Sequence, residues 1–274
     1  MHKFIIRGAR GSMPVCGHSI LRHGGNTTCF SLQTDKGLIV FDAGTGISSV
    51  SRDLASCPAT PPITIMFTHF HLDHVIGLPS FSPLYDPRAW INFMGDPSRK
   101  DDWPTTLRTL FAKPYWPGSL TASGAGKCFE HLPSDQNFLQ IYGARISWCP
   151  VSHPQGCLSY KVECDDKVIV IATDHEHTQS DVSEGFLEFC HGADILIYDA
   201  MYTPAEYVDH VGWGHGNWQL GVQLALEANV GELILTHHEV TRTDTEIDEI
   251  VRQTRKYFPE TKAAMENMVL SCST

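Results

Sequence analysis

The sequence predicts a layered fold that combines α-helices with β-strands, of the α/β or α+β class. Apolar runs of strand length alternate with helix-like stretches along most of the chain. Two of these runs, Ile65–His69 and Leu233–His237, end in Thr-His, and two others, Leu38–Asp42 and Val168–Asp174, end in an aspartate. Two similar halves that face each other would bring these four strand ends to one edge, where layered α/β folds place their chemistry.

The first half of the chain contains strand-like apolar runs separated by turn residues. The turn Asp35-Lys36-Gly37 lies between two such runs and predicts a hairpin. A short helix is expected after the hairpin, to about Leu54, and another is expected from Val75 to Pro79. The predicted strands of this half are Lys3–Arg7, Thr28–Thr34, Leu38–Asp42 and Ile63–Phe67.

The second half shows equally clear patterns. Trp218–Ala228 is amphipathic and predicts a helix, and another helix is expected near Asp181–Cys190. Thr243 and Glu246 have the spacing of a capping box, which predicts that the last helix begins there and extends to about Phe258. The predicted strands of this half are Arg145–Val151, Leu158–Glu163, Val168–Ala172, Ile195–Tyr198 and Leu233–Leu235.

Residues 80–135 lack such regularity. They are rich in proline, glycine and aromatic side chains, with one predicted helix at about Thr105–Ala112. Such a segment is either an insert that shapes the substrate pocket or a long connection over a buried aromatic patch. Its side chains Phe111, Tyr115 and Trp116 therefore either stack on a nucleobase or pack in the core. With this insert included, residues 1–274 are predicted to form a single domain.

Composition limits the functions to consider. No apolar run approaches the ~20 residues of a membrane helix, and the N-terminus lacks an export signal, so a cytoplasmic protein is expected. The nine cysteines are scattered and form no C-x-x-C pair, which argues against a disulfide framework or a cysteine zinc site. The net charge of −11 favours a small substrate over a long nucleic acid.

Three histidines and an aspartate lie close together in Thr68–His74. His69 and His71 are two residues apart, so in an extended segment both rings point to one side and can bind one cation. Asp73 and His74 follow where the chain turns and can bind a second cation. Two cations ~3.5–4 Å apart can share a hydroxide and stabilise the attacking and leaving oxygens of a displacement. Imidazole and carboxylate ligands suit Zn, Mn or Fe.

Three later strand ends carry side chains of the same types: His153, Asp174 and His237, with His238 as a competitor of His237. Together with His69-x-His71-x-Asp73-His74, this order resembles the metallo-β-lactamase superfamily over about residues 3–240. The resemblance implies a four-layer αββα sandwich with two bound metal ions. It implies that Asp174 bridges the ions and that Asp42 supports the site from behind the ligands. The implied ligands are His69, His71 and His153 on one ion, and Asp73, His74 and His237 on the other.

Further motifs narrow the resemblance. Gly214-His215-Gly216-Asn217-Trp218, followed by a helix and Thr236-His237, resembles the ribonuclease Z branch. In that branch a histidine at the position of His215 contacts the scissile phosphate and assists the leaving group. Three more segments resemble a compact bacterial phosphodiesterase subgroup of the branch, some members of which cleave cyclic nucleotides. These segments are Arg7–Pro14, His23–Thr27 and Ala172–His177.

The expected reaction is hydrolysis of a phosphodiester by a hydroxide that bridges two divalent metal ions, with Asp73 and His215 as catalytic residues. The expected substrate is a 3′,5′-cyclic nucleotide or a cyclic dinucleotide. A homodimer is expected because relatives in the resembled branch are often dimers. Three alternatives stay open: a ribonuclease Z-type tRNA 3′ endonuclease, a lactone or thioester hydrolase, and a nucleotide sensor without catalysis.

Overall fold

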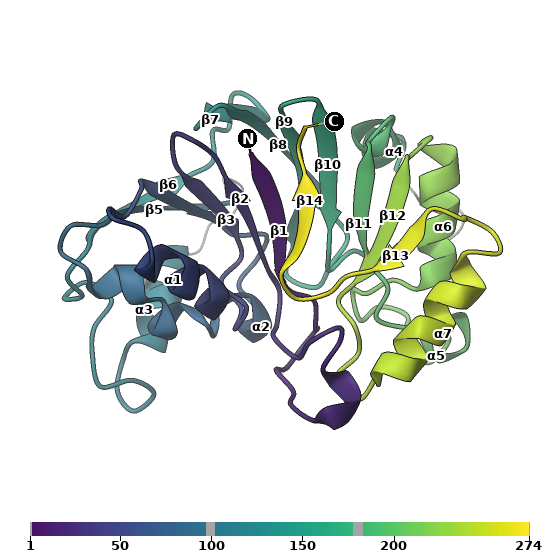
Figure 1. The fold of residues 1–274 in the computed structure, drawn as a ribbon, viewed down its shortest axis with the longest axis horizontal. Coiled ribbons are helices and arrows are strands. Elements are labelled where there is room, and N and C mark those ends of the chain that lie inside the picture. Colours follow the sequence, from purple (N-terminus) through teal and green to yellow (C-terminus); the bar gives the residue numbers. More distant parts are fainter. Residues whose placement is uncertain (1, 97–101, 178–182, 274) are drawn as a thin grey trace.

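Two mixed β-sheets lie face to face, and helices cover their outer sides (Figure 1). The computed structural model describes residues 2–96, 102–177 and 183–273, and within these ranges each sheet has seven strands. The predicted four-layer αββα arrangement is confirmed. Central strands such as β3 and β4 are apolar and fully buried because each lies between the other sheet and a layer of helices.

The first sheet is built from both ends of the chain, in the order β14-β1-β2-β3-β4-β5-β6. Strands β1 and β14 pair antiparallel, so the N- and C-terminal segments lie side by side (Figure 1). Strands β3 to β6 run parallel to one another. The strands are β1 (Lys3–Gly8), β2 (Cys29–Gln33), β3 (Leu38–Phe41), β4 (Ile63–Met66), β5 (Trp90–Gly95), β6 (Gly126–His131) and β14 (Met268–Ser271).

The helices of this half include three short 3₁₀ helices, labelled η. Helix α3 begins after Asp102, whose carboxylate accepts a hydrogen bond from the backbone of Thr105, and it has a proline in its first turn. Trp103 of this helix is buried against Phe67, at a ring distance of 6.3 Å. The helices are η1 (His18–Ile20), α1 (Ile47–Ala55), α2 (Leu72–Val75), η2 (Leu78–Ser80), η3 (Ser82–Tyr85) and α3 (Trp103–Leu110).

The second sheet has the order β13-β12-β11-β10-β9-β8-β7, in which β10 to β13 run parallel. Its strands are β7 (Phe138–Ile141), β8 (Ala144–Val151), β9 (Cys157–Cys164), β10 (Lys167–Ala172), β11 (Ile195–Asp199), β12 (Glu232–Thr236) and β13 (Thr261–Ala263). The helices of this half are α4 (Glu184–Cys190), α5 (Pro204–Tyr207), α6 (Trp218–Glu227) and α7 (Asp244–Thr254). The capping box predicted at Thr243 and Glu246 is present at the start of α7.

Apolar side chains from both sheets fill the space between them. Phe41 on β3 and Tyr160 on β9 are fully buried there, with ring centroids 5.2 Å apart. The hydroxyl of Tyr160 donates a hydrogen bond to the backbone oxygen of Phe67 at 2.7 Å, which satisfies its buried polar group. This contact ties the two sheets together just before the histidine-rich segment.

Some predicted elements differ from the structure. The short helix expected at Val75–Pro79 is instead α2, Leu72–Val75, so Asp73 and His74 are themselves helical. Residues 80–135 are not an irregular insert throughout, because they supply α3 and two strands of the first sheet, β5 and β6. Residues 181 and 182 of the helix expected near Asp181–Cys190 lie outside the described residues. Among those described, no helix combines the length and apolar character needed to cross a membrane.

Candidate metal centre

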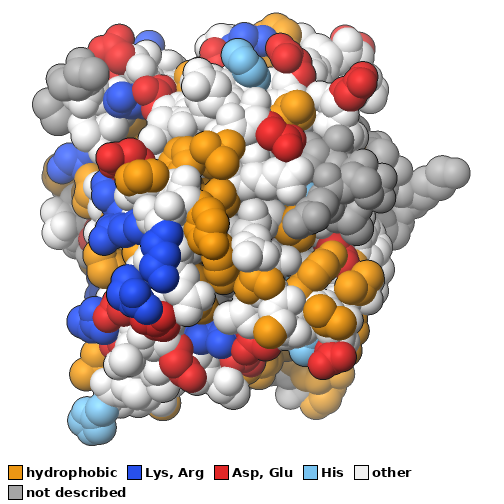
Figure 2. Space-filling model, turned by 90° about the vertical axis from the view of Figure 1, so that its right-hand side faces the viewer, with side chains coloured by type: hydrophobic (Ala, Val, Ile, Leu, Met, Phe, Trp, Pro, Cys, Tyr) orange, Lys and Arg blue, Asp and Glu red, His pale blue; other side chains and the backbone are white. Residues whose placement is uncertain are grey.

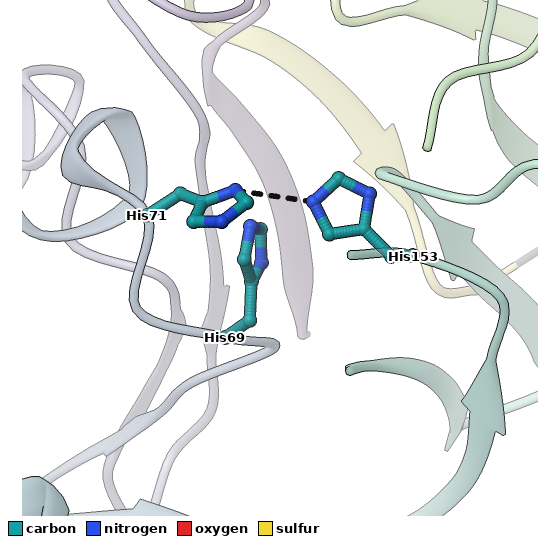
Figure 3. A group of neighbouring side chains, drawn as sticks. All are labelled: His69, His71 and His153. Atoms are coloured by element: carbon teal, nitrogen blue, oxygen red, sulfur yellow. Dashed lines mark hydrogen bonds between the residues drawn. The ribbon is translucent and has the colours of Figure 1, made fainter. Parts of the chain in front are cut away.

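Three histidines from the two halves of the molecule converge on one point (Figure 3). His69 and His71 follow β4, and His153 follows β8 from the opposite side. The Nε2 atom of His153 lies 3.1 Å from Nδ1 of His71, and the ring centroids of His69 and His71 are 4.4 Å apart. The Nδ1–H of His153 donates to the backbone oxygen of Gly214 at 2.7 Å, so its Nε2 lone pair faces the other two rings. The three rings can hold one cation.

A second group of three potential ligands lies next to the first. Asp73 and His74 belong to α2, and His237 follows β12. One carboxylate oxygen of Asp73, Oδ2, is 3.3 Å from Nε2 of His74 and 3.3 Å from Nε2 of His237. The backbone N–H of Ser12 donates to the same oxygen at 2.9 Å. This group can hold a second cation.

The carboxylate of Asp174 lies between the two groups. Its Oδ1 atom is 3.9 Å from Nε2 of His69 and 4.0 Å from Nε2 of His153. Its Oδ2 atom is 3.1 Å from Nε2 of His74 and 3.4 Å from Nδ1 of His237. One oxygen therefore faces each group of ligands, which is the arrangement of a carboxylate that could bridge two cations.

Two buried residues behind the cluster fix the orientation of its rings. Asp42 accepts hydrogen bonds at 2.8 Å from the backbone and hydroxyl of Thr68 and from Nδ1 of His74. The Thr68 hydroxyl donates to Asp42, so it accepts from Nδ1 of His69, 3.1 Å away. Both rings then carry their proton on Nδ1 and turn the lone pair of Nε2 toward the cluster.

The backbone turns sharply at three of these strand ends. Asp42, Asp174 and His237 have φ values of 61°, 54° and 57°, in the left-handed region that residues other than glycine rarely adopt. Asp42 follows β3 of the first sheet, and Asp174 and His237 follow β10 and β12 of the second. Strained residues of this kind persist where the surrounding structure holds them, and they gather at functional sites.

The loop after β1 packs directly against the cluster. Gly11 has no room for a side chain, because a Cβ atom there would collide with the ring of His237. The buried Arg10 holds the loop in place by donating to the backbone oxygens of Glu239 at 2.9 Å, Arg242 at 2.8 Å and Gly24 at 2.9 Å. This packing explains why the sequence from Arg7 to Pro14 is rich in glycine and arginine.

His215 lies just before α6 and faces the cluster. Its Nδ1 atom is 2.8 Å from Oδ2 of the buried Asp199 and 3.8 Å from Oδ1 of Asp174. The backbone N–H of Asp174 also donates to Asp199, at 3.0 Å, which fixes that carboxylate. Burial disfavours the charged ring, but Asp199 and Asp174 together raise the pKa of His215 to about 9. The ring can therefore carry a proton at neutral pH.

The chemistry of the cluster fits divalent cations. Four of its buried atoms make no hydrogen bond with any described residue: Nε2 of His69, Nε2 of His74, Oδ2 of Asp174 and Nδ1 of His237. Each buried polar atom left unpaired costs about 1–3 kcal/mol, so bound cations would stabilise this arrangement. Burial opposes a charge on His74, yet nearby carboxylates, Asp174 first, hold the pKa of His74 well above its usual value. The cluster thus attracts positive charge.

The structure brings all the predicted site residues together: His69, His71, Asp73, His74, His153, Asp174, His215 and His237. His238 turns away from them, and its Nε2 lies 3.4 Å from the backbone oxygen of Ala264. Asp199, which was not among the predicted site residues, belongs to the cluster as well. The sequence pattern that could have identified Asp199 is the one that identified Asp174, an aspartate just after a predicted strand.

Comparisons with known proteins identify the family to which the chain belongs. Ribonuclease BN of Escherichia coli is 23% identical over 290 residues, which cover 87% of this chain and 90% of that protein. The metallo-β-lactamase fold protein YhfI of Bacillus subtilis has 19% identity and a TM-score of 0.74, covering 99% of this chain and 100% of that one. A diphosphatase from the PhnP family has 18% identity and a TM-score of 0.72, covering 99% and 98%. Residues 38–238 match the β-lactamase superfamily domain. The chain therefore belongs to the β-lactamase superfamily and is a hydrolase with the metallo-β-lactamase fold.

Proposed function

We propose that this protein hydrolyses phosphodiesters and that its substrate is small. The placement of His215 carries the proposal. Its ring is 2.8 Å from Asp199 and 3.8 Å from Asp174, so a proton donor stands beside both cation positions. A donor at this place suits the departure of an alkoxide from phosphorus, which needs a proton or a hydrogen bond. A thioester, by contrast, releases a thiolate, a weaker base that departs more readily without such a donor.

The chain supplies several roles in such a reaction. His69, His71 and His153 would hold one divalent cation, Asp73, His74 and His237 would hold another, and Asp174 would lie between them. Bound divalent cations lower the pKa of water and offset charge on phosphoryl oxygens. Burial opposes ionisation of Asp73, but His74 lowers the pKa of Asp73 to about 2, so this carboxylate can accept a hydrogen bond from the attacking water. Asp199 keeps the His215 ring oriented toward the leaving group.

The charges of the chain favour a small substrate. A long nucleic acid binds best to a continuous basic surface. On the face shown in Figure 2, Lys and Arg side chains gather, but acidic side chains lie among them. Arg252 on α7 pairs with Glu249 at 2.6 Å, and Arg22 pairs with Asp248 at 2.5 Å. With a net charge of −11, this favours a small phosphodiester over a long nucleic acid. The motifs that resemble cyclic nucleotide phosphodiesterases make a 3′,5′-cyclic nucleotide or a cyclic dinucleotide the proposed substrate.

Hydrolysis assays with a substitution at His215 test the proposal. Protein supplied with Mn or Zn is expected to cleave a 3′,5′-cyclic nucleotide or bis(p-nitrophenyl) phosphate. With the cyclic nucleotide, whose leaving alkoxide is a strong base, His215→Ala is expected to lower kcat by about 10²–10⁴-fold, because it removes the proton donor. Metal analysis should show an unchanged metal content, since His215 is not among the proposed ligands. His131→Ala, which changes an exposed histidine outside the cluster, is the control. An unchanged kcat in His215→Ala would refute the role proposed for this residue.

The similarity to ribonuclease BN supports phosphodiester chemistry, because ribonucleases cleave the phosphodiesters of RNA. It also favours one alternative, a tRNA 3′ endonuclease. Faster cleavage of precursor tRNA than of any cyclic nucleotide would support the endonuclease. Tight binding of a nucleotide with no hydrolysis product would instead indicate a sensor without catalysis. We also propose that the protein is a homodimer and that each chain binds two ions of Zn, Mn or Fe. Light scattering tests the dimer, and metal analysis tests the number and identity of the ions.

A further inference from the structure

An apolar pocket of about 600 Å³ lies beside α2, the helix that carries Asp73 and His74. It is enclosed by α2, η2, the end of α3 and the loop after α3. None of the described residues that line it is charged. A volume of this size is typical of sites for small molecules.

Helix α2 forms a wall between this pocket and the metal centre. Leu72 and Ile76 are four residues apart, so they project from the same side of the helix, and both line the pocket. Asp73 and His74 project from the other side into the ligand cluster. Leu72 directly follows the possible ligand His71 in the chain, lines the pocket and is about half exposed. The pocket and the cluster are therefore built from consecutive residues of one segment.

Two aromatic residues form the opposite side of the pocket. Trp116 is partly buried and is held by an edge-to-face contact with Phe111, at a ring distance of 6.5 Å. Phe111 itself is only 1% exposed and belongs to the core, so it cannot reach a ligand. Tyr115 and Trp116 line the pocket and can do so. Tyr115 is 75% exposed beside the pocket. A fixed indole and an exposed phenol can stack on a planar ring.

Two hydroxyl groups in the pocket can accept hydrogen bonds. The Ser80 hydroxyl donates to the backbone oxygen of Gly77 at 2.7 Å, and the Thr109 hydroxyl donates to that of Thr105 at 3.0 Å. Each hydroxyl has used its only proton, so its remaining lone pairs are available to N–H donors. A planar, largely apolar group with N–H donors on its edge fits these walls.

We propose that this pocket binds the nucleobase of the substrate while the phosphodiester lies at the metal centre. The inference rests on the proposed phosphodiester hydrolysis. It adds that the base of the substrate determines which phosphodiesters the protein prefers. Substrates with a base should be cleaved with a higher kcat/KM than substrates with a small alkyl group in its place. Stacking on an aromatic side chain is expected to account for about a tenfold preference in kcat/KM.

Two p-nitrophenyl esters distinguish an effect on base binding in the pocket from an effect on the hydrolysis step. Thymidine 5′-phosphate p-nitrophenyl ester carries a base, and methyl p-nitrophenyl phosphate does not, while the leaving group is the same. Tyr115→Ala and Trp116→Ala are expected to lower kcat/KM about tenfold for the thymidine ester only. Trp116→Phe should retain most of the activity because it keeps a flat ring. Trp90→Ala, at an exposed tryptophan on β5 that does not line the pocket, is the matched control.

Binding of adenosine 5′-monophosphate to the metal-loaded protein, measured by calorimetry, is a readout that needs no turnover. We expect Trp116→Ala to raise the Kd about tenfold and Trp90→Ala to leave it unchanged. If neither ester is cleaved but binding still depends on Trp116, the proposed hydrolysis fails and the base pocket stands. Unchanged binding and unchanged kcat/KM in both pocket variants would overturn the inference. The inference would also be overturned if these variants became monomers in light scattering while their affinity for adenosine 5′-monophosphate stayed unchanged. The pocket would then be a contact between two copies of the chain.

Discussion

At the scale of single residues, the cluster depends on side chains that only orient other side chains. Asp42 receives three hydrogen bonds, two from Thr68 and one from His74, and it does so from a left-handed backbone conformation. Asparagine tolerates that conformation about as well as aspartate, but its amide nitrogen cannot accept a hydrogen bond. An asparagine at this position tests the carboxylate separately from the backbone.

We therefore expect Asp42→Asn to fold and to bind metal more weakly, by about 10–100-fold, because the ligand rings lose their fixed orientation. Competition with a coloured chelator measures the affinity. Asp35→Asn, at an exposed turn on the same sheet, is the control and should bind metal like the wild type. An Asp42→Asn protein with wild-type affinity would show that the hydrogen bonds of Asp42 have no part in metal binding.

The residues of the cluster were predictable to different degrees. The positions of His69, His71, Asp73 and His74 followed from their spacing, because few patterns put so many ligand types in one short segment. The contact of Ser12 with Asp73 was not predictable, since it uses a backbone N–H that any residue except proline would supply. Asp199 was predictable, because it directly follows the apolar run Ile195–Tyr198, as Asp174 follows a predicted strand.

At the scale of elements, α7 shows how a local sequence signal determines a helix start. The Thr243 hydroxyl accepts from the backbone N–H of Glu246 at 3.3 Å, and the Glu246 carboxylate accepts from the backbone N–H of Thr243 at 2.8 Å. These bonds satisfy two backbone donors that the helix itself leaves unpaired. The signal spans four residues, so it is readable without knowledge of the tertiary structure.

Thr243→Ala is expected to lower the free energy of unfolding by about 1 kcal/mol, because the helix loses one side of its capping box. Urea denaturation followed by circular dichroism measures this change. Thr245→Ala, an exposed position in the same first turn, should change the value by less than about 0.5 kcal/mol. Equal effects of the two substitutions would mean that the cap adds nothing to stability.

Elements without such signals were missed or misplaced. Helix α2 has only four residues, too few to show a helical period, and β13 has only three. Strand β5, Trp90–Gly95, mixes buried and exposed positions and lies in a stretch rich in proline. Its neighbours β4 and β6 determine its conformation by parallel pairing, which no local pattern of residues shows.

At the scale of the whole molecule, the proposed ligands come from both sheets. His69, His71, Asp73 and His74 follow β4 in the first sheet, whereas His153, Asp174 and His237 follow strands of the second. Bound cations would therefore hold the two halves to each other. The two-half arrangement was predictable from the matching strand ends. The pairing of β14 with β1 was not, because it joins residues from opposite ends of the chain.

Removal of metal should accordingly destabilise the protein. The Tm measured by calorimetry is expected to fall after treatment with EDTA and to recover when Mn or Zn is added, because the cations bind only the folded state. An Asp174→Ala variant should respond much less to added metal, since both cation positions lose their shared ligand. A Tm that is the same with and without EDTA would contradict this expectation.

The antiparallel pairing of Lys3 with Ser271 has a practical consequence. Both chain ends lie in the upper part of Figure 1, whereas α2, which carries Asp73 and His74, lies in the lower half. An affinity tag, a fluorescent protein or another domain attached to either end would leave the entrance to the cluster open. The same proximity makes the protein suitable for circular permutation, since a short linker could join the two ends without stretching either strand.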